Sequence, residues 1–190
     1  NTYSFPKQGG LYHGEHLIVR RDESGKVVSV EIEDSVVFPR RDVGVGVGET
    51  FTIQPVKPMS ELREAALAGT PPAEGKPRAS ELVELTSLDA SINLDIRYAS
   101  TNNFMQSVFY DEARAFMQKP AAEALVRVHE GLHKHGYGLL IYDAYRPWYV
   151  TKMFWDATPE DKKIFVANPE YGSRHNRGCA VDVTLVDIAT

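Results

Sequence analysis

The chain has 190 residues, a formal net charge of −5, 43% hydrophobic residues and a single cysteine, Cys179. This length predicts one domain, or one domain with an appended segment, and the hydrophobic content is sufficient for a buried core. The negative charge argues against nucleic acid as the main partner, one cysteine excludes an internal disulfide, and no apolar stretch is long enough to span a membrane.

The N-terminal part of the chain is rich in β-branched side chains. Short runs separated by turn-forming residues predict strands at residues 17–20, 26–32 and 35–38. We therefore expect a β-rich segment over residues 1–58. The glycine-rich stretch at 44–48 lacks the last glycine of a nucleotide-binding loop, because Glu49 stands there, and it is predicted to form strand or turn.

A short helix and a linker are predicted next. Residues 59–68 have a helical pattern, with Ser60 as the expected N-cap and Gly69 as the stop. Residues 69–80 contain three prolines and two glycines, which is typical of a linker or an arm on the surface. A second domain is therefore expected over residues 81–190.

Residues 121–135 form the strongest helix pattern of the chain, preceded by Pro120 and followed by Gly136. The apolar residues recur at helical spacing and predict the face that is buried. The residues expected on that face are Leu125, Val128 and Leu132.

The same helix contains the pattern His-Glu-x-x-His of zincin proteases, at residues 129–133. Against a metal site, Gly131 weakens the helix by about 1 kcal/mol relative to alanine, and no recognisable third ligand follows. We expect a solvated cluster of histidines at the helix end, and the zincin site remains the alternative.

Residues 138–142 predict a short buried strand that leads directly into Asp143 and Arg146. Pro147 then suits the first position of a helix over residues 148–155. Arg146 therefore lies between a strand and a helix, where functional side chains are common. The alternative for Arg146 is a structural bridge to Asp143 or Asp156.

The most informative pattern is Ser-x-His-x-x-Gly-x-Ala-x-Asp, which runs from Ser173 to Asp182. An alternating run follows it and predicts a half-buried strand with Asp182, Thr184 and Val186 on one face. His175 and Asp182 offer the nitrogen and oxygen ligands that zinc accepts, although catalytic zinc needs a third protein ligand. A solvated histidine and a surface aspartate are the alternative for an isolated pair of this kind.

Three separated segments resemble one known family. They are the pattern at 173–182 and two segments with matching order and spacing, residues 96–104 and 136–147. Together they are similar to the VanX-type D-alanyl-D-alanine dipeptidases, which are related to the zinc D,D-carboxypeptidases and the hedgehog signalling domain. The resemblance covers roughly residues 85–190.

The resemblance implies an α+β zinc D,D-peptidase-like fold, with an antiparallel sheet and flanking helices. It implies that zinc binds His175, Asp182 and a second histidine, and that Arg146 stabilises the oxyanion of the scissile carbonyl. It further implies that Tyr98, Asn103 and Ser173 contact substrate.

One part of the family pattern is missing. The catalytic glutamate and the second histidine occur in the family as Glu-x-x-His downstream of the aspartate, whereas this sequence continues for eight residues after Asp182 without them. We therefore expect the domain over 81–190 to lack its C-terminal part, which a missing segment or a companion chain would supply.

The resemblance implies zinc-dependent hydrolysis of D-alanyl-D-alanine or a similar small D,D-dipeptide, in peptidoglycan metabolism or glycopeptide resistance. Two alternatives remain open: a D,D-carboxypeptidase that acts on longer stem peptides, and a non-catalytic module that binds the cell wall. The added β-rich segment favours a periplasmic or cell-envelope location, with the cytoplasm as the alternative.

Overall fold

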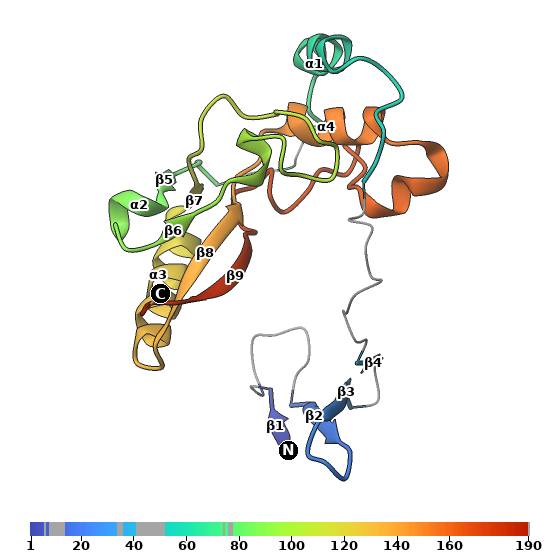
Figure 1. Cartoon of the computed structure of the whole chain (residues 1–190). Coiled ribbons are helices and arrows are strands. Elements are labelled where there is room, and N and C mark those ends of the chain that lie inside the picture. The colour runs from blue at the N-terminus through green and yellow to red at the C-terminus, as the bar shows by residue number, and fades with distance from the viewer. Residues whose placement is uncertain are drawn as a thin grey trace. The chain divides into compact units, whose positions relative to one another are not determined.

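The computed structural model describes residues 1–5, 7, 14–33, 36–40, 52–73, 75 and 78–189 (Figure 1). It divides into two compact units, Asn1–Glu49 and Thr50–Thr190. This division lies before the expected boundary at residue 58, because the helix that follows residue 58 packs within the second unit. The glycine-rich stretch at 44–48 lies outside the described residues.

The first unit is an antiparallel sheet with the strand order β1-β2-β3-β4. Its strands are β1 (Thr2–Ser4), β2 (His16–Arg21), β3 (Val27–Ile32) and β4 (Val36–Pro39). The last three correspond to the three expected runs, and β1 adds an edge strand that the sequence pattern did not indicate. Asp22 closes the β2–β3 turn, since its carboxylate accepts hydrogen bonds from the N–H groups of Ser24 and Lys26.

The second unit contains helices and strands in alternation. Its helices are α1 (Met59–Ala68), α2 (Leu85–Leu88), α3 (Lys119–His133) and α4 (Trp148–Ala157), with the 3₁₀ helices η1 (Arg97–Ala99) and η2 (Glu160–Phe165). Its strands are β5 (Leu82–Glu84), β6 (Asn93–Leu94), β7 (Phe116–Gln118), β8 (Tyr137–Asp143) and β9 (Asp182–Asp187). This unit is a mixed α+β structure, which confirms the predicted fold class.

Two small sheets form in this unit. Strands β5 and β7 pair antiparallel, and the larger sheet has the order β6-β8-β9. Strands β8 and β9 pair antiparallel, but β6 and β8 are parallel, so the larger sheet is mixed and not purely antiparallel as expected. The parallel pair is possible because the long connection that contains α3 carries the chain back to the start of β8.

Helix α3 lies along β8 (Figure 1), and its inner face packs against one of two hydrophobic clusters. The expected buried face is only partly right. Leu125 and Leu132 pack against this cluster, but Val128 is 53% exposed and His129 is fully buried in its place. The buried position in the middle of this helix face is therefore residue 129, a histidine, and not residue 128 as predicted.

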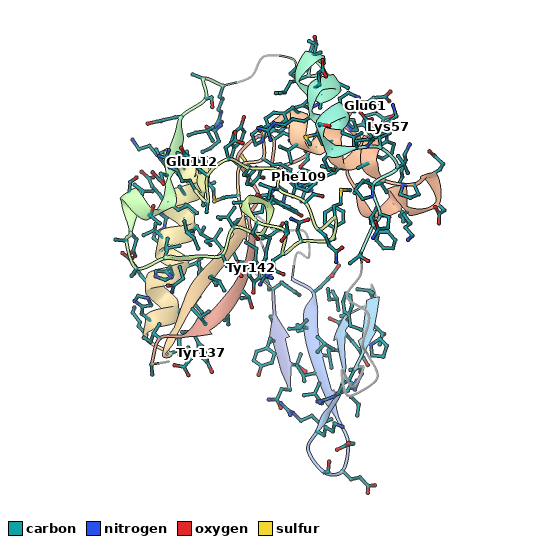
Figure 2. The ribbon with its side chains drawn as sticks, turned by 45° about the horizontal axis from the view of Figure 1, so that its top comes forward. Lys57, Glu61, Phe109, Glu112, Tyr137 and Tyr142 are labelled. Atoms are coloured by element: carbon teal, nitrogen blue, oxygen red, sulfur yellow. The ribbon has the colours of Figure 1, made fainter. Side chains whose placement is uncertain are left out.

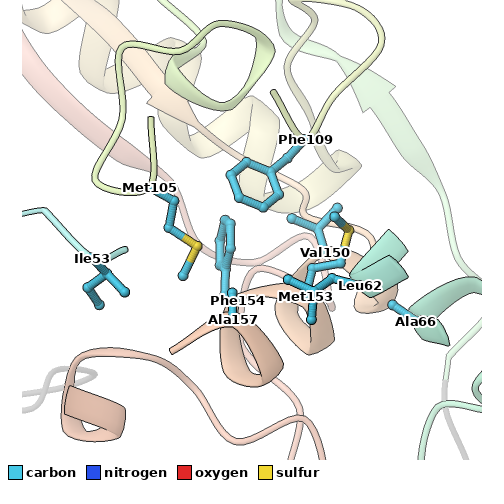
Figure 3. Packing of buried hydrophobic residues seen from close by; sticks show 9 residues of the cluster. All are labelled: Ile53, Leu62, Ala66, Met105, Phe109, Val150, Met153, Phe154 and Ala157. Carbon is cyan, nitrogen blue, oxygen red and sulfur yellow. The ribbon is translucent and has the colours of Figure 1, made fainter. Parts of the chain in front are cut away.

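The second hydrophobic cluster joins α1 to α4 (Figure 3). Leu62 and Ala66 of α1 contribute to it together with Val150, Met153 and Phe154 of α4. Because these side chains are nearly inaccessible to water, α1 is part of the core of this unit.

The N-terminus of α1 differs from the expectation. Pro58 occupies the N-cap position, and Ser60, the predicted cap, lies inside the helix. Lys57 and Glu61 form an ion pair of 2.8 Å across this first turn, and they lie next to each other in Figure 2. Gly69 ends the helix as predicted.

Three predicted elements, two strands and a helix, carry the candidate site. Strand β8 ends at Asp143, and α4 begins at Trp148 with Pro147 as its N-cap, which confirms the expected strand, turn and helix. Strand β9 forms as predicted, but five of its six residues are exposed, so the expectation of a half-buried strand is wrong. Within the described chain β9 is an edge strand, because it pairs with β8 on one side and with no described strand on the other.

Candidate metal and substrate site

A tight turn positions His175. The side-chain oxygen of Asn176 accepts a hydrogen bond of 2.8 Å from the Ser173 N–H, and the Ser173 hydroxyl accepts one of 3.0 Å from the His175 N–H. Asn176 also donates to the Arg146 carbonyl and the Thr151 hydroxyl, at 2.9 and 2.8 Å. The bonds from Asn176 hold the turn against the β8–α4 connection and the first turns of α4, so His175 has a fixed position beside that connection.

The turn ends at Gly178, whose φ of +67° is strained for any residue with a Cβ atom. The Gly178 N–H donates to the His175 carbonyl at 3.0 Å, and the Gly178 carbonyl accepts from the Gln118 N–H at 2.9 Å. A Cβ atom here would lie 2.7 Å from Leu82 Cδ2. The glycine of the sequence pattern is therefore required both by its backbone conformation and by close packing.

The imidazole of His175 presents a defined nitrogen to the site. Its Nδ1 lies 2.8 Å from the carbonyl oxygen of Ala144, which can only accept, so Nδ1 carries the proton. Nε2 therefore has its lone pair available as a metal ligand. A carbonyl that fixes the tautomer in this way is typical of metal-binding histidines.

A bulge in the sheet brings Asp182 to the same place. Ile141 pairs with Val183 and Asp143 pairs with Asp182, so Tyr142 is an extra residue in β8. The bulge sets the carboxylates of Asp143 and Asp182 across from each other at the end of the strand pair. Asp182 is half exposed, whereas Asp143 is 1% exposed.

His175 and Asp182 have the separation expected of two ligands of one zinc ion. Nε2 of His175 lies 3.6 Å from Oδ1 of Asp182. Zinc–nitrogen and zinc–oxygen bonds of usual length at a tetrahedral angle place the two ligand atoms about 3.4 Å apart. The residues present therefore fit a zinc ion as two of its three protein ligands.

The two groups also influence each other's ionisation. The contact with His175 holds the pKa of the Asp182 carboxyl below its usual value. Burial alone would lower the pKa of His175, but the contacts with Asp182, the Ala144 carbonyl and Asp143 together outweigh burial and raise it. A metal ion must displace the proton from this pair, and its affinity is expected to fall as the pH falls.

Asp143 and Arg146 form a buried pair beside these ligands. Oδ2 of Asp143 accepts hydrogen bonds from Nε and Nη2 of Arg146, at 3.0 and 2.7 Å. Oδ1 accepts a hydrogen bond of 2.7 Å from the hydroxyl of Tyr110. The bridge from Arg146 to Asp143, which the sequence left open, is therefore present, and it directs Arg146 toward the site.

The guanidinium of Arg146 is held between aromatic rings. Its central carbon lies 5.3 Å from the ring centroid of Tyr98 and 4.9 Å from that of Phe154. Nη2 lies 3.9 Å from Oδ2 of Asp182, so the cation directly faces a candidate zinc ligand. The hydrogen bonds to Asp143 use Nε and Nη2 of the guanidinium.

A cavity of about 450 Å³ adjoins Asp182. It is lined by Arg97, Tyr98, Asn102, Asn103, Phe104, Tyr142, Asp143 and Asp182. Burial raises the pKa of Tyr98 to about 12, so its hydroxyl remains a hydrogen-bond donor at neutral pH. Tyr142, labelled in Figure 2, stacks beneath the Arg97 guanidinium at 4.5 Å. The cavity thus combines aromatic walls with a few polar groups, as ligand sites do.

The structure brings some of the predicted site residues together and places others in the wall of the cavity or in a turn. His175, Asp182 and Arg146 converge, and Tyr98 and Asn103 line the adjoining cavity. The amide of Asn103 donates to the carbonyls of Arg97, Ser100 and Ser107, so it also shapes its own loop. The Ser173 hydroxyl already accepts a hydrogen bond within the turn. The substrate contacts of these residues stay predictions.

The His-Glu-x-x-His pattern on α3 does not form a metal site in this structure. His129 is buried, its Nδ1 accepts a hydrogen bond from the Leu139 N–H, and its Nε2 lies 3.0 Å from the Ser91 hydroxyl. Both ring nitrogens are therefore occupied, and the expectation of a solvated cluster is wrong for His129. Within the described chain, the acidic, histidine and cysteine side chains that converge as possible metal ligands are Asp143, His175 and Asp182.

A larger cavity of about 770 Å³ lies beside the proline-rich arm and α4. Its walls include Pro71, Pro72, Tyr145, Trp148 and the exposed Cys179. None of the converging metal-ligand residues lines it, and the smaller cavity is therefore the candidate substrate site.

Several known proteins are similar in sequence to this chain, and the three described here have the same name. D-alanyl-D-alanine dipeptidase of Escherichia coli (strain K12) is 35% identical over 108 residues, which cover 57% of this chain and 55% of that protein. The D-alanyl-D-alanine dipeptidases of Enterococcus faecium and Streptomyces coelicolor are both 31% identical, over 52% and 54% of this chain and 58% and 60% of their own lengths. The chain thus spans little more than half the length of these relatives.

The family match agrees with the part of the chain that carries the site. The sequence profile of Peptidase_M15, described as D-ala-D-ala dipeptidase, matches residues 78–189. This range contains the two candidate zinc ligands, the Asp143–Arg146 pair and the adjoining cavity. The chain belongs to the Peptidase_M15 family of D-ala-D-ala dipeptidases.

Proposed function

We propose that residues 50–190 form part of a zinc-dependent dipeptidase that hydrolyses D-alanyl-D-alanine. The observation that carries this proposal is the convergence of Nε2 of His175, Oδ1 of Asp182 and the Arg146 guanidinium at one end of the β8–β9 pair. The family match and the names of the relatives support the choice of substrate.

Each side chain of the site has a distinct role in this proposal. His175 and Asp182 would hold zinc, which would lower the pKa of a bound water and polarise the peptide carbonyl. Asp143 fixes the fork of Arg146, and the guanidinium would donate to the carbonyl oxygen as negative charge develops on it. Tyr98 and Asn103 line the cavity that would receive the dipeptide, and Ser173 would contact its carboxylate.

We further propose that the third zinc ligand and the general base come from polypeptide outside residues 1–190, as a continuation of the chain or a companion chain. In the described residues the third group near the pair is Asp143, and both of its oxygens already bind Arg146 or Tyr110. The relatives are longer than the matched region, which is consistent with a further segment.

The alternatives differ in how they treat longer substrates. A cavity of about 450 Å³ lies at the small end of the usual range for ligand sites, which favours a dipeptide. A D,D-carboxypeptidase would cleave peptides with a blocked amino terminus, whereas a dipeptidase would not. A non-catalytic wall-binding module would bind such peptides but would cleave neither them nor the dipeptide.

The zinc assignment is tested with alanine variants of the full-length protein. We expect His175→Ala and Asp182→Ala to lose stoichiometric zinc, measured by elemental analysis of folded protein. His133→Ala is the matched control and should keep its zinc, because His133 lies on α3 outside the converging group. Full zinc in His175→Ala would contradict the assignment, and zinc loss in His133→Ala would favour the zincin alternative.

In the described residues, no helix combines the length and the apolar composition needed to cross a lipid bilayer. We propose a periplasmic or cell-envelope location, because peptidoglycan fragments would be met there, with the cytoplasm as the alternative. Fractionation of cells that express the full-length protein, followed by immunodetection, distinguishes the two.

A further inference from the structure

Tyr110 occupies an unusual position in the core. It lies in the connection between η1 and β7, and its ring packs against both hydrophobic clusters of the second unit. Its backbone N–H donates to the Tyr98 carbonyl at 2.9 Å. Ring and backbone are therefore held in place, and the hydroxyl donates a hydrogen bond to Asp143.

Asp143 is the residue that accepts this hydrogen bond. Its carboxylate is 1% exposed and lies within 4.8 Å of the ligand atoms of His175 and Asp182. An aspartate so placed has two possible partners, the Arg146 guanidinium or a metal ion. The 2.7 Å bond from Tyr110 to Oδ1, together with the two bonds from Arg146 to Oδ2, satisfies both oxygens.

We propose that Tyr110 is a positioning residue that holds Asp143 on Arg146 and out of the metal's ligand set. The carboxylate without this hydroxyl has a buried oxygen with no partner, and rotation toward the metal would satisfy it. Arg146 would lose its fixed support in the same movement. This inference rests on the proposed zinc function of the site and assigns to Tyr110 a role that acts through Asp143.

The test uses Tyr110→Phe in the full-length protein, which removes one hydroxyl and keeps the ring in the core. The matched control is Tyr149→Phe, which removes the hydroxyl of another partly buried tyrosine, one that packs against the cluster between α1 and α4 only. The protein is loaded with Co²⁺, whose visible absorption weakens as its coordination number rises. We expect weaker absorption for Tyr110→Phe than for the wild type and no change for Tyr149→Phe.

Hydrolysis of D-alanyl-D-alanine gives a second readout. For Tyr110→Phe we expect kcat to fall about 10- to 100-fold, the scale of a misplaced catalytic group, while KM changes little. In an Arg146→Lys background the same substitution should cause little further loss, because it acts through Arg146. Tyr149→Phe should keep the wild-type kcat.

The outcomes separate this inference from the proposed function. A wild-type protein that binds Co²⁺ but does not cleave the dipeptide refutes the proposed function, and the Co²⁺ spectra then decide the role of Tyr110. Unchanged absorption and kcat in a folded Tyr110→Phe protein would overturn the inference. Independent, multiplying losses from Tyr110→Phe and Arg146→Lys would overturn it as well.

Discussion

Replacing Gly178 by alanine should destabilise the second unit and disturb the zinc site together. The backbone at φ +67° costs a residue with a Cβ atom about 1–2 kcal/mol. The new Cβ would also lie 2.7 Å from Leu82 Cδ2 and 3.2 Å from the Gln118 backbone nitrogen. Overpacking of this kind costs about 1–3 kcal/mol, which brings the expected loss to about 2–5 kcal/mol.

Thermal unfolding followed by circular dichroism measures this loss. A unit of this size shifts its Tm by about 3 °C per kcal/mol, so Gly178→Ala should lower the Tm by about 6–15 °C. Zinc content should fall as well, because the Gly178 N–H bonds the His175 carbonyl and any shift of the turn moves the imidazole.

Two other glycines separate the causes. Gly136 has φ +82°, and no described atom lies within 4 Å of where its Cβ would be, so Gly136→Ala should cost only the strain, about 1–2 kcal/mol. Gly131 lies in α3 with similar space at its Cβ position, and Gly131→Ala should stabilise the protein by about 0.8–1 kcal/mol. A Gly178→Ala protein with the wild-type Tm and zinc content would refute the reasoning.

Two further predictions concern charge. Arg146→Lys should lower kcat by about 10²-fold with zinc retained, because lysine keeps the charge beside Asp143 but loses the fork; a variant that unfolds would show that the bridge is mainly structural. Burial lowers the pKa of His129 in the folded protein, while in the unfolded chain this pKa is about 6.5. The stability contributed by neutral, buried His129 is therefore fully present above about pH 6.5. It is lost as the pH falls from there through the pKa of the folded protein. Tm measured from pH 7 to 5 should therefore fall less steeply for His129→Gln than for the wild type, and equal slopes would contradict this.

Local patterns predicted the elements of the site well. The strand β8, the turn through Asp143 and Arg146, and the helix after Pro147 follow from apolar runs and proline chemistry that act within a few residues. Strand β9 follows from alternation, although its exposure does not, because alternation carries no information about what covers a strand.

The contacts that complete the site come from elsewhere in the chain and left no local signal. Tyr110 reaches Asp143 across 33 residues, and nothing in its neighbourhood distinguishes it from a packing tyrosine. The bulge at Tyr142 depends on the pairing of two strands, which the pattern of either strand alone does not contain. The burial of His129 could not be predicted either, because it depends on two partners, Ser91 and the Leu139 N–H, that satisfy its ring nitrogens.

The packing of α1 on α4 has a consequence for protein expression. The family match begins at residue 78, but Leu62 and Ala66 of α1 are 2% and 1% exposed against α4. A fragment cut at the family boundary would leave Val150 and Met153 facing water, on the helix that follows Arg146 directly. The shortest piece that keeps this core intact begins before Ile53, and fragments for crystallisation or assay are better designed from the core than from the family match.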